Sequence, residues 1–470
     1  MDDLIKRNYV YNLISQLLTI FIPVITTPYI SRTLGAQAIG DFSYTTGIVS
    51  YFCMFAMLGT ANYAQREIAK RHESDKDVSC LTYEILIIRM VMISISATLY
   101  LIFVRFPTFT RYRVLLSVQI ISFVSWGLDI TWLYQGLEKF KVTATRNVLI
   151  KLISMGLVFI FVKNENDLIL YTVIYCISEL VGNISMWPST RGILVRVPFK
   201  LLSFRRHVRG IMELFLPNIA LQLYTVFDKT MLGAMVNTLE VGYYSQAEKI
   251  IKIVLVAISS LSMVLLPRFS YLNTMGNQRS ANKYYISAIE YTYFLAIPMT
   301  IGCICVADNF VPVFFGSGYA MVAPIMKILS ILFIIMSVEK LMGTILIAYN
   351  KQNVYTASVI IAAVINVLLN VIFISVLNMN AIGVAIASVF AELAALIVQL
   401  CNLPKIFQKN AIYKSLPDYL LSGVFMFLAL LLLDRFEISA YWQLVLDIVI
   451  GSGVYITLLA GIKKLRIRNG

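Results

Sequence analysis

The sequence predicts an all-α protein that crosses a membrane many times. The chain has 470 residues, of which 59% are hydrophobic, and its mean hydropathy is +0.79. Soluble domains are usually about 45–50% apolar. Apolar stretches of about 20 residues recur along the whole length, and each is long enough for a helix to cross a hydrocarbon core of about 30 Å. A transmembrane β-barrel would instead show alternating segments of about 10 residues.

Fourteen helical spans account for these stretches. No cleavable signal peptide is expected, because the first apolar run contains Pro23 and Pro28 and continues into the second without a small-residue cleavage site. No gap between spans is long enough for a soluble domain, the longest being 189–210. The predicted spans are 12–31, 42–64, 83–104, 114–135, 145–163, 168–188, 211–235, 243–266, 285–306, 322–348, 355–376, 381–402, 416–433 and 441–461.

The distribution of lysine and arginine predicts the orientation of the chain. If the N-terminus is cytoplasmic, inner segments hold 26 of the 39 basic residues and outer segments hold six. This asymmetry predicts that both termini are cytoplasmic. The net charge of +14 is therefore attributed to topology and to attraction by anionic lipid headgroups, and no nucleic-acid partner is expected.

The sequence also contains an internal repeat. Residues 136–180 match residues 349–393 at a constant offset of 213, which aligns Glu179–Leu180 with Glu392–Leu393. Residues 34–48 resemble 232–250, and in this register Arg66 corresponds to Arg268. An even number of spans per copy makes the repeats parallel, a transporter symmetry that places the substrate path between two lobes. Gene fusion without rocking of the lobes is the alternative.

Three regions follow from the repeat. The predicted lobes are 1–200 with spans 1–6 and 201–410 with spans 7–12, arranged around a central cavity. Residues 411–470 add two C-terminal helices and a basic cytoplasmic tail.

Charged residues inside two spans of the second lobe point to a site. Lys229 lies about 10 Å below the outer end of its span, at about 1.5 Å per residue. Glu248 and Lys249 reach a similar depth in the next span, and Lys252 lies one turn deeper. A charge inside a span costs about 2.5–3.5 kcal/mol on insertion scales and usually faces a cavity or a partner. We therefore expect one charged layer, in which the lysines bind substrate, Asp228 pairs with Lys249, and Glu248 is a further partner.

The first lobe carries a thinner copy of this layer, with Arg32 as a substrate-binding cation and Asp41 as its charge partner. A polar stripe on span 211–235 is expected to line the cavity. It consists of Asn218, Gln222, Thr225 and Lys229. The alternative is that Lys229 extends to the outer interface while Asp228 only pairs with it.

Arg89, in the inner third of span 83–104, is a further candidate for an inward-facing vestibule, with snorkelling as the equal alternative. Lys151, Lys327 and Lys340 are weaker candidates of the same kind. Glu179 and Glu392 occupy equivalent mid-span positions, as proton sites or, more simply, as structural carboxylates. No enzyme, cofactor or metal site is expected, since the sequence has no nucleotide-binding loop and no spaced Cys or His cluster.

The segments that carry the charges also carry a family resemblance. "PYISRTLGAQAIGDFSY" (28–44), "DKTMLGAMVNTLEVGYYSQAEKI" (228–250) and "LLPRFS" (265–270) resemble Wzx-type polysaccharide flippases of the multidrug/oligosaccharidyl-lipid/polysaccharide (MOP) exporter superfamily. The resemblance implies a MATE-like fold in the bacterial cytoplasmic membrane. It also implies a flippase that carries undecaprenyl-diphosphate-linked oligosaccharide outward by alternating access, for O-antigen, capsule or a similar polymer. Polymerase or other assembly proteins and a coupling ion, H⁺ or Na⁺, are possible partners.

Two relatives of the same superfamily remain as alternatives. Lipid II flippases match "RTLGAQAIGD", but span 42–64 has no basic residue, whereas their second helix is richer in basic residues. A cation-coupled multidrug exporter should favour an acidic aromatic cavity, and the net-basic layer argues against it. A membrane glycan polymerase would need a large outer loop, and no predicted outer loop exceeds about 20 residues.

Overall fold

The computed structural model describes residues 2–57, 59–71, 73–407, 410–436 and 438–469. Within these ranges, the side chains of 2–20, 213–214, 216–225, 260–261, 263–264, 411 and 466–469 are not described. The described chain is helical, and it divides into two compact units, Met1–Thr230 and Met231–Gly470. The region boundaries expected after residues 200 and 410 stay predictions.

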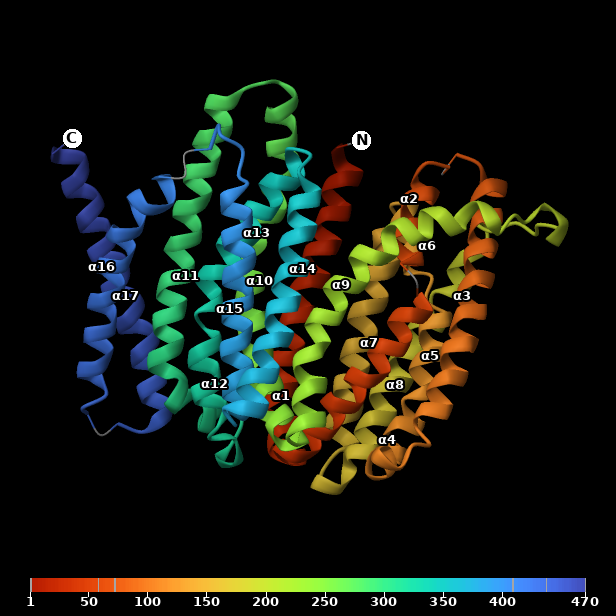
Figure 1. The fold of residues 1–470 in the computed structure, drawn as a ribbon, viewed down its shortest axis with the longest axis horizontal. Helices are drawn as coiled ribbons and strands as arrows, with labels where there is room; N and C mark the ends of the chain where they lie inside the picture. Colours follow the sequence, from red (N-terminus) through yellow and green to blue (C-terminus); the bar gives the residue numbers. More distant parts are fainter. Residues whose placement is uncertain (1, 58, 72, 408–409, 437, 470) are drawn as a thin grey trace. The chain divides into compact units, whose positions relative to one another are not determined.

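Unit 1 is a helical bundle in which α1 packs on α3 and α7, and α8 packs on α5 and α7 (Figure 1). Short 3-10 turns, η1 to η4, connect or extend these helices: Pro107–Tyr112, Glu165–Asp167, Trp187–Thr190 and Phe199–Leu201. The helices are α1 (Asp2–Met57), α2 (Thr60–Ala69), α3 (Asp75–Phe103), α4 (Arg113–Val118), α5 (Ile120–Gly127), α6 (Thr131–Gly136), α7 (Phe140–Phe161), α8 (Leu168–Ile184) and α9 (Arg205–Met235).

Gly35 divides α1 into the first two predicted spans. Its backbone angles are φ 75° and ψ 168°, inside an otherwise helical segment. This region of backbone space is accessible essentially only to glycine. The glycine of "RTLGAQ" is therefore what lets one continuous stretch of helix change direction between Arg32 and Asp41.

Unit 2 is built from longer helices, with α10 packed on α11, α12 and α13, and α14 packed on α15. A 3-10 turn, η5 (Ser317–Tyr319), precedes α12, and a π-helical turn, η6 (Ile372–Val376), ends α14. The helices are α10 (Thr238–Thr274), α11 (Gln278–Phe314), α12 (Val322–Leu329), α13 (Leu332–Ala348), α14 (Gln352–Val371), α15 (Asn380–Cys401), α16 (Asn410–Leu433) and α17 (Ala440–Asn469).

The two C-terminal helices share the core of unit 2. Tyr419 of α16 and Tyr455 of α17 are buried in the same apolar cluster as Tyr293 of α11. The Tyr455 hydroxyl donates to the Tyr293 carbonyl at 3.4 Å. The repeated segments 136–180 and 349–393 form the helix pairs α7–α8 and α14–α15, each packed side by side in its own unit.

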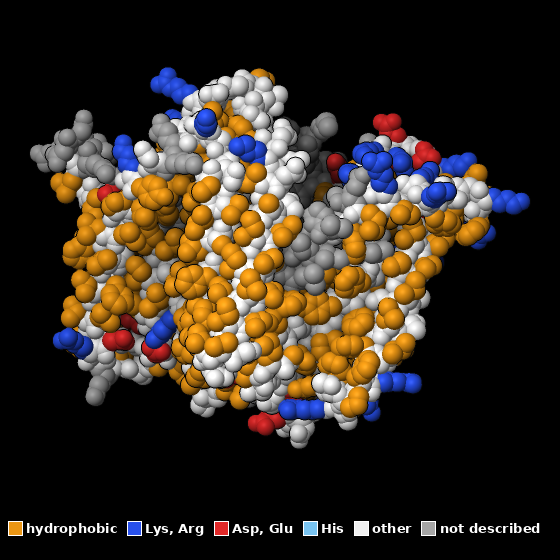
Figure 2. All heavy atoms as spheres, in the orientation of Figure 1, with side chains coloured by type: hydrophobic (Ala, Val, Ile, Leu, Met, Phe, Trp, Pro, Cys, Tyr) orange, Lys and Arg blue, Asp and Glu red, His pale blue; other side chains and the backbone are white. Residues whose placement is uncertain are grey.

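The helix surfaces suit a bilayer. Large apolar side chains such as Leu99, Ile102 and Leu368 are more than half exposed. Figure 2 shows apolar side chains over the middle of each unit and Lys and Arg mainly towards the helix ends. Among the described residues, nine helices are long and apolar enough to cross a membrane, or eleven if two bent pairs each form one span. The protein is therefore a multi-pass helical membrane protein. All fourteen predicted spans fall on helical segments, and the total of fourteen stays a prediction.

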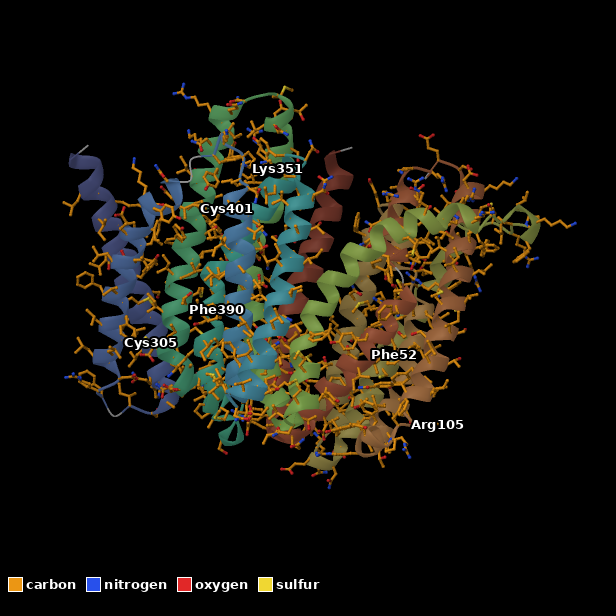
Figure 3. The ribbon with its side chains drawn as sticks, in the orientation of Figure 1. Phe52, Arg105, Cys305, Lys351, Phe390 and Cys401 are labelled. Atoms are coloured by element: carbon orange, nitrogen blue, oxygen red, sulfur yellow. The ribbon has the colours of Figure 1, made fainter. Side chains whose placement is uncertain are left out.

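The ends of each unit follow the order expected from the sequence. Lys351, predicted to be inner, lies at the opposite end of unit 2 from Cys305 (Figure 3). Arg105, predicted to be outer, lies at the opposite end of unit 1 from the turn between α2 and α3. Which end faces the cytoplasm stays a prediction.

A polar cluster around the buried side chains of Glu84 and His207 connects the start of α9 to α3 and α2. The Glu84 carboxylate on α3 accepts from Ser203 N at 2.5 Å and from Arg206 Nη2 at 2.6 Å. Its Oε2 also lies 2.6 Å from His207 Nε2, and His207 Nδ1 lies 2.8 Å from the Tyr63 hydroxyl. Burial lowers the pKa of the His207 imidazole, and hydrogen bonding to Glu84 opposes this shift. A neutral ring that donates from Nε2 to Glu84 and accepts at Nδ1 from Tyr63 satisfies all of these contacts. We call Glu84, His207, Tyr63, Arg206 and Ser203 the α9 clasp.

Candidate functional site

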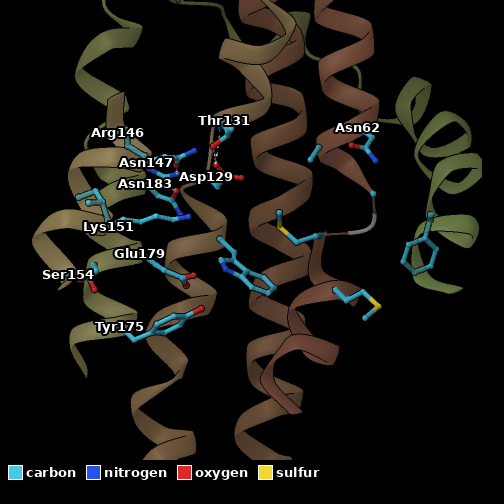
Figure 4. A pocket seen from close by; sticks show the side chains of 18 residues that line it. Asn62, Asp129, Thr131, Arg146, Asn147, Lys151, Ser154, Tyr175, Glu179 and Asn183 are labelled. Carbon is cyan, nitrogen blue, oxygen red and sulfur yellow. Dashed lines mark hydrogen bonds between the residues drawn. The ribbon is translucent and has the colours of Figure 1, made fainter. Parts of the chain in front are cut away.

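A polar cavity of about 650 Å³ lies in unit 1 among α1, α2, α5, α6, α7, α8 and α9. Its wall combines cations, carboxylates, amides, hydroxyls and aromatic rings (Figure 4). The polar and aromatic lining residues are Asn62, Trp126, Asp129, Thr131, Arg146, Asn147, Lys151, Ser154, Tyr175, Ser178, Glu179, Asn183 and Phe215. Such a set inside a lipid-facing bundle indicates a polar ligand, because unsatisfied polar groups in an apolar environment are costly.

Arg146 is held in the cavity wall by two amide side chains. Its Nη1 donates to Asn147 Oδ1 at 2.6 Å, and its Nη2 donates to Asn183 Oδ1. Asn183 in turn donates to the carbonyl and the hydroxyl of Ser125, at 2.8 and 2.9 Å. A Cβ on Gly182 would stand 3.0 Å from Arg146 Nε. Contacts with α7, α8 and α5 therefore fix the position of the guanidinium. Gly182 has no side chain, and this leaves room for the Arg146 guanidinium.

The second cation, Lys151, lies on the same helix as Arg146 and lines the same cavity. It is half-buried. Two carboxylates face this part of the wall. Glu179 lines the cavity together with Tyr175 and Trp126. Asp129 Oδ1 accepts from the backbone nitrogen and hydroxyl of Thr131, at 3.0 and 2.5 Å.

This arrangement suits a ligand that is both anionic and rich in hydroxyls. Guanidinium and ammonium groups are the strong protein donors to phosphate oxygens. Amides and carboxylates hydrogen-bond hydroxyls, and the rings of Trp126 and Tyr175 offer apolar faces with a polar edge. Two cations and two carboxylates line the cavity, so its wall is mixed in charge.

The cavity chemistry is specific to unit 1. At the repeat offset of 213, only Glu179 retains its charge, as Glu392. Apolar residues occupy four equivalent positions: Arg146, Asn147, Lys151 and Asn183 correspond to Val359, Ile360, Val364 and Leu396. The two repeats therefore share a pair of packed helices, but only the pair in unit 1 has these polar side chains.

Arg89 is fully buried and is not among the residues that line this cavity. Its Nη1 donates to the Asp129 carbonyl at 2.6 Å, and its Nε donates to the Thr60 hydroxyl at 3.2 Å. Its guanidinium carbon lies 5.6 Å from the centre of the Trp132 ring. In this position Arg89 holds the non-helical break between α5 and α6, the break that also carries Asp129. A vestibule role for Arg89 stays a prediction.

The predicted first-lobe pair lies at the outer-predicted end of unit 1. Arg32 is exposed and lines a shallow depression of about 700 Å³ with Tyr29 and Lys163. Asp41 is paired with Arg111 at 3.5 Å and accepts from Gln37 at 2.9 Å. Arg111 follows the third span and was not expected as the partner of Asp41.

The members of the predicted charged layer are divided between the two units. Asp228 is buried and Lys229 is half-buried at the end of unit 1, where Thr230 shares a hydrogen bond of 2.7 Å with Tyr51. In unit 2, Lys252 pairs with Glu248 at 2.5 Å on α10, and Lys249 is exposed. The layer itself, including Asp228 with Lys249, stays a prediction. Asn218, Gln222 and Thr225 lie outside the residues whose side chains the structure describes.

Sequence reasoning missed the main residue of the cavity. Arg146 was grouped with the basic residues of the inner surface because it stands at the start of its predicted span, yet it lines the cavity on α7. Lys151 and Glu179 were noted only as weak candidates. The available signal was their spacing, because Arg146, Asn147, Lys151 and Ser154 recur on one side of α7.

The helical architecture places the protein in a class of multi-pass membrane proteins with the fold seen in solved structures of the MOP superfamily. The solved structure "Lipid II flippase MurJ, inward closed conformation" matches with a TM-score of 0.75 and 17% identity, over 98% of this chain and 99% of that chain. An inward-facing multidrug resistance MATE family transporter matches with a TM-score of 0.62 and 14% identity, over 90% and 98%. These similarities confirm the MATE-like fold.

The profile of the family described as "Polysaccharide biosynthesis protein" matches residues 5–273, more than half of the chain, and the chain belongs to this family. A putative O-antigen transporter of Escherichia coli strain K12 is 24% identical over 374 residues, 78% of this chain and 89% of that protein. A putative O-antigen transporter of Shigella dysenteriae is 23% identical over 386 residues, 80% and 94%. A probable low-salt glycan biosynthesis flippase of Haloferax volcanii is 25% identical over 165 residues, 35% of this chain and 34% of that protein.

Proposed function

We propose that the protein is a flippase for lipid-linked oligosaccharides in the bacterial cytoplasmic membrane. It carries undecaprenyl-diphosphate-linked repeat units from the inner to the outer leaflet by alternating access, for assembly of a surface polysaccharide. The observation that carries the proposal is the unit 1 cavity, whose cations, amides and rings match the diphosphate and sugars of such a lipid. Membership of the polysaccharide biosynthesis family supports the same class of cargo.

Each part of the wall has a role in this proposal. Arg146 and Lys151 lower the cost of bringing a diphosphate into a low-dielectric region. Asn62, Asn183 and Glu179 bind sugar hydroxyls, and Trp126 stacks on a sugar face. The polyprenyl tail stays in lipid, so only the polar head needs this cavity.

The energy source is proposed to be the membrane potential or an ion gradient. An inside-negative potential favours outward movement of an anion by about 2.3 kcal/mol per charge per 100 mV. Reconstitution into vesicles tests this. Transport should follow an imposed potential or an H⁺ or Na⁺ gradient, and a requirement for hydrolysed ATP would refute it.

The cavity is tested in a strain that lacks the gene and is complemented with variants. Arg146→Gln and Lys151→Gln should each reduce surface polymer per membrane-inserted protein at least tenfold, since a charge-assisted hydrogen bond contributes about 1.5–3 kcal/mol. Lys141→Gln, an exposed change on the same helix outside the cavity, is the matched control and should retain normal output. Normal output from both cavity variants would refute the assignment of the diphosphate to this cavity.

Substrate class is tested separately with purified protein in vesicles. A fluorescent undecaprenyl-diphosphate oligosaccharide should be flipped, and flipping should be lost in Arg146→Gln. Preferential flipping of lipid II would favour the lipid II alternative, and export of a cationic dye without flipping of the oligosaccharide would favour the drug exporter.

A further inference from the structure

A groove at the inner-predicted end of unit 2 lies outside the site described above. It has a volume of about 480 Å³ and is formed where α10 ends and α11 begins. Its lining is Leu265, Pro267, Arg268, Tyr271 and Tyr284. We call it the Arg268 groove.

The length of the two helices places this groove at a membrane surface. α10 and α11 have 37 residues each, and at about 1.5 Å per residue such helices are about 55 Å long. About 20 residues suffice to cross the hydrocarbon core. The predicted spans of these helices end at 266 and begin at 285, so Arg268, Tyr271 and Tyr284 fall just beyond the apolar segments. In Figure 1 the junction of α10 and α11 extends past the other helix ends of unit 2. Tyrosine and arginine are typical of this boundary.

The guanidinium of Arg268 is positioned by two rings and remains open to a ligand. Its Nη2 donates to the Tyr284 hydroxyl at 3.1 Å. Its central carbon lies 4.9 Å from the centre of the Tyr284 ring and 5.8 Å from that of Tyr271. Tyr271 is 52% exposed and Tyr284 is 38% exposed. Because a guanidinium has five N–H donors in a planar fork, this position leaves a bidentate edge available for an anion.

The equivalent arginine of unit 1 differs in one respect. Arg66 lies 5.7 Å from the Tyr63 ring, but its Nε is also 3.4 Å from the carboxylate of Glu67, the next residue. In unit 2 the residue after Arg268 is Phe269, which is buried. Across the described side chains, Arg268 forms no ion pair with a carboxylate. Both copies of the repeat therefore place the arginine against a tyrosine ring. Among the described side chains, only the arginine of unit 1 has a carboxylate partner.

We propose that the Arg268 groove binds the headgroup phosphate of one anionic glycerophospholipid of the inner leaflet. The guanidinium accepts the phosphate between the two tyrosines, and the acyl chains continue along the apolar side at Leu265 and Pro267. A single guanidinium matches the single negative charge of a phosphodiester, whereas a diphosphate would call for a second cation. Basic pockets beside membrane helices bind lipid headgroups in this way. The lipid joins α10 to α11 at the surface, and the inference does not depend on the cargo proposed above.

Native mass spectrometry of delipidated protein tests the proposal by titration with phosphatidylglycerol. Wild type should bind one phosphatidylglycerol more tightly than the rest. Arg268→Gln should weaken this binding about tenfold, because it removes the charge-assisted hydrogen bonds between the guanidinium and the phosphate. Arg279→Gln, an exposed change in the first turn of α11, should leave it unchanged. Tyr284→Phe keeps the ring and removes the hydroxyl, so it provides a second variant, with an expected loss of about threefold to fivefold, should Arg268→Gln fold poorly.

Further ligands separate the possible sources of binding. Diacylglycerol, which has no phosphate, should not occupy the site, and inorganic phosphate at millimolar concentration should compete only weakly. Equal phosphatidylglycerol binding by wild type, Arg268→Gln and Tyr284→Phe would overturn the proposal. So would equal losses in Arg268→Gln and Arg279→Gln, which would indicate non-specific surface charge. Tighter binding of undecaprenyl diphosphate than of phosphatidylglycerol at this arginine would overturn the assignment to a glycerophospholipid.

Discussion

The α9 clasp gives the sharpest prediction for stability, through the substitution Glu84→Gln. Glu84 is fully buried, and its two carboxylate oxygens serve three donors, from Ser203, Arg206 and His207. Glutamine has nearly the same shape but only one acceptor oxygen. Its NH₂ group would therefore face at least one N–H donor beside the buried His207 ring.

The magnitude follows from these contacts. Losing one or two charge-assisted hydrogen bonds costs about 1.5–3 kcal/mol each, and relief of the desolvated carboxylate offsets part of this cost. We expect a net loss of about 2–4 kcal/mol. For a unit of about 230 residues, 1 kcal/mol corresponds to about 2–4 °C in melting temperature. The expected decrease is on the order of 10 °C.

Two assays measure this effect in detergent-solubilised protein. The melting temperature should fall in Glu84→Gln and should stay unchanged in Glu73→Gln, an exposed glutamate in the turn before α3. Trypsin should also cut the connection between η3 and α9 faster, because Arg191, Arg196 and Lys200 lie on the segment that the clasp restrains. A Glu84→Gln protein that melts within about 1 °C of wild type and is cut at the same rate would refute the reasoning.

Three further predictions concern other parts of the chain. Burial lowers the pKa of His207 below its usual 6.5, so the unfolded chain takes up this proton before the folded protein does as the pH falls. The stability of wild type should therefore be full above pH 6.5 and decrease below it. In His207→Gln the melting temperature should depend less on pH between 7.5 and 5.5, if Glu84, Arg206 and Tyr63 keep their charge states. Gly35→Ala should lower stability by about 1–3 kcal/mol because φ at this residue is positive. Gly156→Ala is the control: it lies in a helix with open space where the added Cβ would stand, so it should be neutral or stabilising. Equal melting temperatures of the two variants would contradict this prediction. Lys229→Ala and Lys249→Ala should abolish surface polymer while Lys229→Arg retains part of it, and a normal ratio of polymer to inserted protein in both alanine variants would exclude them from substrate binding.

The sequence alone was sufficient for the class and architecture of the protein. Long apolar runs have one solution in a bilayer, since helices satisfy their own backbone hydrogen bonds. The two segments related by the 213-residue offset each form a packed helix pair, α7–α8 and α14–α15. The family resemblance was also confirmed by the match over residues 5–273.

The location of a polar cavity could not be obtained in this way. Arg146 and Arg89 are both basic residues within predicted spans, and the sequence does not show which of them lines a cavity. Only the packing of α2, α3 and α6 buries Arg89 against the carbonyl of Asp129, and only the amides of α7 and α8 turn Arg146 into the cavity. The spacing of residues along a helix gives the depth of a charged side chain in the membrane and the side of the helix on which it lies. It does not give the neighbouring helices that this side contacts.

The sequence by itself thus determined that this chain is a helical protein that crosses the membrane many times, because hydropathy is a local property of each segment. The tertiary structure decided which charges are neutralised by neighbours and which are presented to a ligand. Asp41 and Arg111 illustrate the difference, since they lie far apart in the sequence on α1 and η1 and their side chains come within 3.5 Å of each other in the folded chain. Charge pairing depends on distances of a few ångströms between side chains from different helices, and those distances exist only in the folded chain.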